Sequence, residues 1–545
     1  MADINDNIIS YENTGDSQDV IRSISPISSE FSIKPRNNSL LGVFYGIGMN
    51  VNNMIGAGIV SSPGTVWNTV KSPGIVLSLW LIGGIVSMAG SLTYVELGAI
   101  HKISGGETKY LQTAYPNPKL LMSYLFSFMF VLVIKPGLLC AILQIGAQYF
   151  WYTIKGETYI QTYKPESEKT LSDDDIPELN LIGWYLPFSP FWFVKFLAIL
   201  LLFVITVYHM LSNRWAAIIN QVLAIIKLIT YSIIAIAGIY ELCQKKEISS
   251  NNWKTQLNGN TDIAGYSSAI LLIMFAYNGW NNLNYSLDEF RNPEKKLILS
   301  NSISVAIVTV IYFLVNVAFI SVVPKEQIES KDKIDNDNNH ETIAAEFFNQ
   351  LFGKQFTRIF TFLVLLSIMG TAAVEVWSGS RVIVAAANSD LFPKYSQKLK
   401  NWNERFNTPI NALLAQFVWC SFLMIFVGGS FSISNFELFS KLASYSYWIF
   451  YLATGIGLLL IRRRSENNEV KSFKVPLPVV GIFILGGVFI LTFSFIVDKP
   501  LQLSPILLSY GFLIIALLSW YFFYYWWDNK KKQRESAIMR IAGNQ

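Results

Sequence analysis

The sequence contains few charged residues, few cysteines and few histidines. Asp, Glu, Lys and Arg make up 14% of its 545 residues, against about 25% in a typical soluble protein, so an ordinary soluble enzyme is excluded. Cys140, Cys243 and Cys420 lie in or beside apolar stretches, which excludes a disulfide-built ectodomain and a cysteine redox motif. The three histidines are too scattered for a metal cluster. We therefore expect no metal, no cofactor and no catalytic residues.

Apolar residues dominate instead, at 52% of the chain. A membrane-spanning helix needs about 20 mostly apolar residues. Windows of that length predict an all-α polytopic membrane protein with 12 transmembrane helices. The windows are residues 42–66, 73–100, 120–150, 191–211, 215–241, 264–288, 299–323, 356–389, 409–429, 436–461, 476–497 and 504–527.

Basic residues are clustered between these windows and do not form one basic face, so a nucleic-acid partner is not expected at a net charge of +5. The order of the windows places the basic clusters at 462–464 and 530–532 on one side of the membrane. The long loops 152–190 and 325–355 fall on the other side and are acidic. The positive-inside rule then predicts that both termini are cytoplasmic. Residues 1–40 are polar and predict a disordered cytoplasmic tail without a signal peptide.

The first and sixth windows contain Gly and Asn at their middle. The first has three Asn followed by Gly56-Ala57-Gly58, and the sixth has four Asn within residues 275–284. Transporters built from inverted repeats place the substrate at broken helices in corresponding positions of the two halves. The pattern therefore predicts two facing breaks. The competing interpretation is that Gly in a membrane helix only allows close packing.

The expected partners of the chain are the lipid bilayer around it and a small substrate. Two such breaks suit a zwitterionic α-amino acid as that substrate. Freed N–H groups at the start of a half-helix stabilise a carboxylate, and freed carbonyls accept hydrogen bonds from an ammonium. Phe275, Tyr277 and Trp280 of the sixth window could form gate and pocket walls, or could serve ordinary packing. The expected substrate-binding residues are Ile55, Gly56, Ala57, Gly58, Phe275, Ala276, Tyr277, Asn278 and Trp280.

Three charged residues inside the windows are candidates for energy coupling. Lys227, Glu375 and Lys135 each lie in an apolar stretch, and an ionisable group within a membrane is a functional candidate by default. Lys227, near the middle of the fifth window, has no charged neighbour in the sequence.

Short motifs also occur in order along nearly the whole chain. They include Gly56-Ala57-Gly58-Ile59-Val60, Tyr94-Val95-Glu96-Leu97-Gly98, Ser104-Gly105-Gly106-Glu107, Ile134-Lys135-Pro136-Gly137, Phe275-Ala276-Tyr277-Asn278-Gly279-Trp280-Asn281 and Glu289-Phe290-Arg291-Asn292-Pro293. The ordered set resembles the L-type amino-acid transporter family of the amino acid, polyamine and organocation superfamily. Within that family the chain is similar to the fungal methionine-permease branch.

The resemblance implies a LeuT-like fold, in which an inverted repeat of five plus five helices is followed by two further helices and helices 1 and 6 are broken. It also implies alternating-access movement of amino acids. The corresponding parts are a permease domain at 41–527, with repeat one at about 41–241, repeat two at about 264–461 and the extra helices at 476–527, and a basic cytoplasmic tail at 528–545.

The same resemblance suggests roles for the charged candidates. It implies that the Lys227 ammonium replaces the second sodium ion of the LeuT-like site and touches the break in the first window, either as a fixed cation or as a proton-titrating switch. Glu375 could neutralise Lys227, carry a symported proton or pair with another polar group. Lys135 could pair with the substrate, with a helix carbonyl or with a structural partner.

Two residues depart from the family pattern, which usually has Ser at the position of Ala57 and Gly at that of Asn278. Ala57 loses one hydroxyl contact but keeps its backbone N–H, whereas Asn278 changes the volume or polarity of the pocket. Members that pair with a heavy chain do so through a Cys in the loop after the third window. Loop 152–190 has none, so no disulfide-linked heavy chain is expected.

The sequence thus predicts a plasma-membrane permease for neutral L-amino acids, with methionine or another large neutral side chain preferred. We expect transport coupled to protons and independent of sodium. An exchanger or uniporter of the same family, a non-transporting amino-acid sensor, and a vacuolar or other endomembrane location remain the alternatives. A membrane-embedded enzyme is disfavoured because the windows lack a converging set of nucleophiles and bases.

Overall fold

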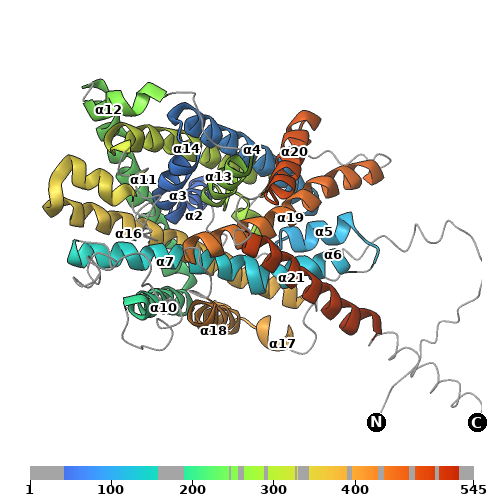
Figure 1. The fold of residues 1–545 in the computed structure, drawn as a ribbon. Helices are drawn as coiled ribbons and strands as arrows, with labels where there is room; N and C mark the ends of the chain where they lie inside the picture. The colour runs from blue at the N-terminus through green and yellow to red at the C-terminus, as the bar shows by residue number, and fades with distance from the viewer. Residues whose placement is uncertain are drawn as a thin grey trace, which may run out of the picture. The chain divides into compact units, whose positions relative to one another are not determined.

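The computed structural model describes residues 42–118, 120–156, 190–244, 247–255, 263–287, 293–325, 328, 343–388, 396–427, 435–465, 473–496 and 503–526. Helices make up most of this part of the chain (Figure 1), which contains one isolated bridge between Asn403 and Thr408 and no strand. The predicted tails, 1–40 and 528–545, and most of the loops 152–190 and 325–355 lie outside the described residues.

The first predicted window forms two helices, α2 (Val43–Met54) and α3 (Ala57–Val70), with a break at Ile55 and Gly56. Both residues have extended backbone, with ψ of 106° at Ile55 and φ of −167° at Gly56. The break lies slightly before the predicted segment 56–58, because Ala57 and Gly58 already form the first turn of α3.

The sixth window is also interrupted. Helix α13 (Ile263–Ala276) ends where the Asn-rich segment begins, turns occupy residues 277–281, and a single 3-10 turn, η4 (Asn282–Tyr285), follows. Gly279 has a φ of 116°, which favours glycine over residues with a side chain.

The remaining windows coincide with helices in the same order. They are α4 (Pro73–His101), α6 (Leu121–Met129), α7 (Lys135–Lys155), α10 (Pro190–Leu211), α11 (Asn213–Cys243), α14 (Pro293–Val322), α16 (Ile343–Asn388), α18 (Ile410–Phe426), α19 (Asn435–Ser465), α20 (Leu477–Phe493), and α21 (Ser504–Trp520) with the π-helical η8 (Tyr521–Trp526). Short connecting elements are α5 (Glu107–Ala114), α12 (Glu247–Asn252), η3 (Trp253–Thr255) and α17 (Ser396–Leu399).

Eight described helices are long and apolar enough to cross a membrane, and α13, α18 and α20 are shorter apolar helices. The prediction of an all-α polytopic membrane protein is therefore confirmed. The count of 12 crossings and the five-plus-five inverted repeat stay predictions.

Two further irregularities have local causes. A π-helical segment, η1 (Phe130–Ile134), joins α6 to α7 just before Lys135 and Pro136. Proline lacks an N–H and displaces the preceding turn, so the extra residue of a π-bulge accommodates it. Helix α16 begins before the predicted window and bends at Gly353, where φ is 72°.

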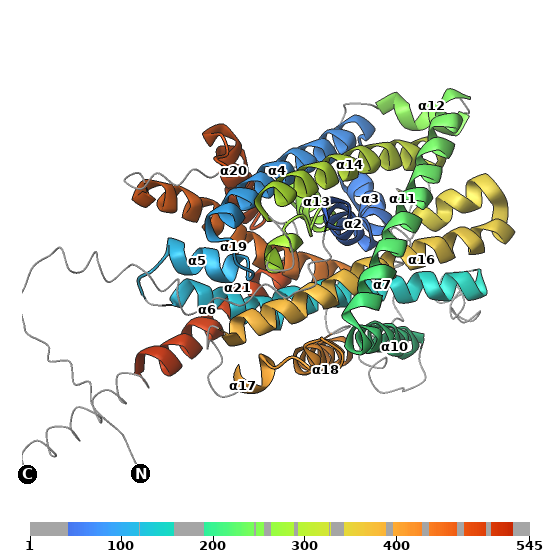
Figure 2. The same ribbon diagram turned by 180° about the vertical axis from the view of Figure 1, so that it is seen from behind.

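The broken helices lie at the centre of the bundle. In both Figure 1 and Figure 2, α2 and α3 are surrounded by α4, α11, α13, α14 and α16. Residues 49–54 and 57–64 are all buried, while many Ile, Leu and Phe side chains of α10, α11, α18, α20 and α21 are exposed. Interrupted backbone is tolerated within a membrane where other helices shield it from lipid, and these breaks meet that condition.

Candidate functional site

The two breaks are in direct contact. A Cβ atom at Gly58, in the first turn of α3, would lie only 2.5 Å from the Cα atom of Ala276, the last residue of α13. Gly279 approaches the side chain of Asn53 in α2 so closely that a Cβ there would collide with its amide nitrogen. The prediction that the breaks face each other agrees with these contacts.

The Tyr312 hydroxyl of α14 joins the ends of the two half-helices. Its oxygen lies 2.5 Å from the carbonyl oxygen of Met54 and 2.8 Å from that of Ala276. A hydroxyl has one proton to donate, so the two carbonyls share it. Sequence reasoning did not select Tyr312, because its only local signal is a Tyr in an apolar window.

Backbone groups are also available on the other side of the first break. Gly56 occupies the N-cap position of α3 and has no side chain with which to cap the following N–H groups. The first turn of α3, including Ala57 and Gly58, therefore offers N–H donors and the positive end of the helix dipole to an anion.

Lys227 of α11 is fully buried and reaches the carbonyl side of the same break. Its Nζ donates to the carbonyl oxygens of Asn52 at 2.6 Å and Ile55 at 2.5 Å, and to Thr371 Oγ1 at 3.2 Å. Thr371 in turn donates towards the same two carbonyls, at 3.0 and 2.9 Å. The ammonium thus occupies a cage of oxygen atoms of the kind that binds a hard monovalent cation.

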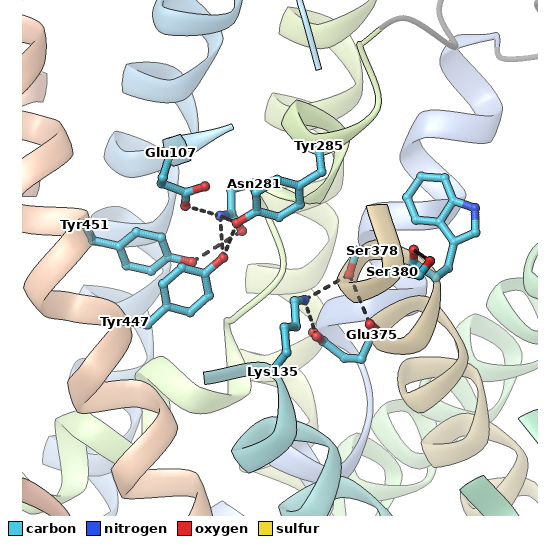
Figure 3. A network of polar contacts seen from close by, with 10 residues as sticks. Glu107, Lys135, Asn281, Tyr285, Glu375, Ser378, Ser380, Tyr447 and Tyr451 are labelled. Atoms are coloured by element: carbon cyan, nitrogen blue, oxygen red, sulfur yellow. Dashed lines mark hydrogen bonds and ion pairs between the residues drawn. The ribbon is translucent and has the colours of Figure 1, made fainter. Parts of the chain in front are cut away.

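Glu375 and Lys135 form a buried ion pair, and Lys135 Nζ also donates to Ser378 Oγ at 2.9 Å (Figure 3). Helices α7 and α16 are thereby joined. The sequence identified both residues but not their pairing. Glu375 therefore neutralises Lys135 rather than Lys227.

The predicted aromatic residues of the sixth window point in different directions. Phe275 packs edge-to-face on Phe436 of α19. Tyr277 donates to the Trp80 carbonyl oxygen of α4 at 3.0 Å, which directs its hydroxyl into the packing between helices. The remaining one, Trp280, is 2% exposed and packs on Tyr94 and Tyr451. Asn278 is half-buried at the turn.

A second polar cluster lies beside the Lys135–Glu375 pair in Figure 3 and connects α5, the turn after α13, and α19. Asn281 is at its centre and donates to Glu107 Oε1 at 2.8 Å. Sequence reasoning quoted Glu107 only as part of a motif and gave it no role. The available signal was a Glu directly after Gly105-Gly106, outside the predicted windows.

The geometry so far defines a polytopic helical membrane protein with two facing helix breaks at its centre and a lysine ammonium bound to one of them. Residues 41–518 match the family model for amino acid permease. The chain belongs to the amino acid permease family, whose members are transporters and not enzymes.

Known relatives cover most of the chain. It is 27% identical over 455 residues to the cystine/glutamate transporter of Homo sapiens, covering 83% of this chain and 79% of that protein. It is 24% identical over 458 residues to the high-affinity methionine permease of Saccharomyces cerevisiae, covering 83% and 72%. It is 25% identical over 460 residues to the serine/threonine exchanger SteT of Bacillus subtilis, covering 84% and 91%. These relatives confirm the resemblance to an amino-acid transporter family.

Proposed function

We propose that this protein moves neutral L-amino acids across the plasma membrane by alternating access, with methionine or another large neutral side chain preferred. The observation that carries the proposal is the contact between the two breaks, Gly58 against Ala276. It brings the N–H groups of α3 and the carbonyl end of α13 to one place. A carboxylate and an ammonium on the same carbon atom match these two sets of groups.

A neutral substrate side chain is supported by the charges around the breaks. Lys135 and Glu375 neutralise each other, and Lys227 is held by backbone carbonyls and Thr371. A charged substrate side chain would need one of these groups to exchange its partner, and leaving a buried charge without a partner is costly.

Sodium independence is supported by Lys227. Its ammonium already supplies a positive charge to the carbonyl oxygens at the end of α2, where an alkali cation would otherwise bind. We propose that a proton gradient drives uptake and that both termini face the cytoplasm, as the distribution of basic residues indicates.

Uptake by the purified protein in proteoliposomes tests the proposal. Radiolabelled amino acids would be supplied singly, with and without an inward proton gradient, in sodium-free buffer. Accumulation of neutral L-amino acids with the gradient is expected. Absence of both accumulation and exchange for every amino acid would contradict the transporter proposal.

Obligatory exchange is a second candidate mechanism. It is favoured by the similarity to a protein named as a serine/threonine exchanger. Vesicles preloaded with unlabelled amino acid separate the two mechanisms. Uptake that requires internal amino acid and ignores the proton gradient would replace proton symport by exchange.

A further inference from the structure

Glu107 differs from the other fully described buried carboxylates of the bundle in having no cationic partner. Glu96 is paired with Arg462, whose Nε lies 2.8 Å from its Oε1, and Glu375 is paired with Lys135. Among the described residues, no Lys, Arg or His forms an ion pair with Glu107, although its side chain is 0% exposed.

The two glycines before Glu107 turn it towards the interior. Gly105 and Gly106 have φ of 126° and 51°, values that favour glycine. A Cβ at Gly106 would lie 2.5 Å from the Tyr285 ring, so the chain passes directly against that ring before α5 begins at Glu107. The backbone therefore fixes the carboxyl group inside the cluster.

The hydrogen-bond partners of Glu107 come from two other segments, α4 and the turn after α13. Tyr94 Oη of α4 donates to Oε1 at 3.0 Å, and Asn281 Nδ2 donates to the same oxygen at 2.8 Å. Asn281 Nδ2 also lies 2.9 Å from each of the hydroxyl oxygens of Tyr285 and Tyr447, which are themselves hydrogen-bonded (Figure 3).

The other carboxyl oxygen is free. Within the described part of the chain, Oε2 of Glu107 is buried and has no hydrogen-bond partner. An ionised carboxylate requires donors for both oxygens when it is removed from water. A proton on Oε2 removes the buried charge, which is the costlier of the two unpartnered states, and leaves both hydrogen bonds to Oε1 intact.

The titratable groups around Glu107 are nearly all phenols. Those that face it, together with the nearest buried ion pair, are Tyr94 of α4, Tyr110 of α5, Tyr285 of η4, Tyr447 and Tyr451 of α19, and Lys135 with Glu375 beyond Tyr285. Phenols are neutral at physiological pH and the ion pair has no net charge. Burial raises the pKa of the Glu107 carboxyl from 4.5 to about 7.

We propose that Glu107 is the proton-binding residue of the transporter, a role that rests on the proposed proton-driven transport. The neutral acid allows α5, the turn after α13 and α19 to pack together as they do here. Ionisation requires water at Oε2, and therefore separation of these elements. The carboxylate takes one proton from water on the side to which it opens, and releases the same proton when it opens to the other side.

Replacement Glu107→Gln tests this role, because the amide is neutral at every pH and nearly equal in shape. Wild-type protein and the variant would be reconstituted in proteoliposomes and tested with radiolabelled L-methionine under a gradient of one pH unit. Coupling to one proton allows about tenfold accumulation. The variant is expected to exchange methionine without accumulating it, so that the internal concentration is about equal to the external one. Glu437→Gln serves as a control, since Glu437 is partly exposed and paired with Lys441 one turn away.

The outcomes separate the two proposals. If the wild type accumulates methionine and Glu107→Gln does so equally, Glu107 is not the proton site and the transport proposal stands. If the wild type exchanges methionine but ignores the gradient, proton coupling fails and this inference fails with it. If the wild type neither binds nor moves any amino acid, the proposed function itself fails.

A second variant covers the case in which Glu107→Gln does not fold. Glu107→Asp keeps an acid but withdraws it from Asn281, so the pH at which uptake is half-maximal should shift while coupling remains. Infrared difference spectra recorded between pH 5 and 8 should show a protonated carboxyl band in the wild type that moves in Glu107→Asp. An unchanged pH profile and an unchanged band would overturn the inference.

Discussion

The Nζ atom of Lys227 donates to the carbonyl oxygen of Ile55 at 2.5 Å, across 172 positions of the sequence. Ile55 is the C-cap residue of α2, so a charge carried by α11 stabilises the end of a half-helix. Cations near helix C-termini are favourable because the carbonyl dipoles point towards them.

Replacement Lys227→Ala should abolish transport. It leaves the carbonyls of Asn52 and Ile55 dependent on Thr371 alone, and each buried polar group left without a partner costs about 1–3 kcal/mol. Uptake and thermal unfolding would both be measured, with Lys195→Ala of α10 as a control for loss of a lysine distant in sequence from the break. Wild-type uptake by Lys227→Ala would remove this residue from the mechanism.

Replacement Gly58→Ala should impair both packing and transport. The new Cβ would meet the backbone of Ala276 at 2.5 Å, and overpacking of this kind costs typically 1–3 kcal/mol. Gly481→Ala in α20 is a matched control, because nothing lies within 4 Å of the Cβ it adds. Substrate affinity would be measured by displacement of labelled methionine. Equal affinity in the two variants would show that the contact between Gly58 and Ala276 is not needed for substrate binding.

Replacement Lys135→Met or Glu375→Met should destabilise the protein strongly, by about 3–5 kcal/mol each, because the partner is left charged and buried. The double variant should be more stable than either single variant. Unfolding of the four proteins forms a double-mutant cycle. Additive losses in that cycle would show that the ion pair contributes no coupling.

The stability of the wild type should decrease as the pH rises from about 4.5 to about 7. Because burial raises the pKa of the Glu107 carboxyl from 4.5 to about 7, the folded protein binds this proton more tightly than the unfolded chain over that window. The loss should reach roughly 3 kcal/mol and should be absent in Glu107→Gln. The measurement is the unfolding midpoint against pH, and an equal slope in both proteins would contradict it.

Replacement Tyr312→Phe should destabilise the joined half-helices by about 1–3 kcal/mol, since two buried carbonyls lose their shared donor. Tyr445→Phe is a suitable control, because its hydroxyl donates to the Leu491 carbonyl oxygen at 3.2 Å on other helices. A larger loss of turnover in Tyr312→Phe than in Tyr445→Phe is expected from initial uptake rates. Equal losses would contradict it.

Local patterns in the sequence predicted the helices well, because length and apolar composition alone decide which segments can span a membrane. The break at Gly56 was predictable for a similar reason, since glycine beside Asn residues weakens a helix locally. Its exact start at Ile55 was not, because cap positions depend on partners such as Lys227.

Pairings between distant residues could not be read from the sequence. Lys135 and Glu375 are 240 positions apart, and an apolar window shows that a charge is buried without showing what it faces. Likewise, Tyr277 is adjacent to Ala276 but directs its hydroxyl to Trp80. Glu107 was overlooked because a Glu between two predicted spans resembles an ordinary loop residue.

The single proton of Tyr312 lies within reach of two carbonyl oxygens, one at the end of each half-helix. In such a three-centre bond the hydroxyl keeps its proton and can turn it from one acceptor to the other by rotation about the C–O bond. A small relative displacement of the two half-helices would therefore leave the hydroxyl bonded to one of them. The junction would therefore keep at least one of its two hydrogen bonds during such a displacement.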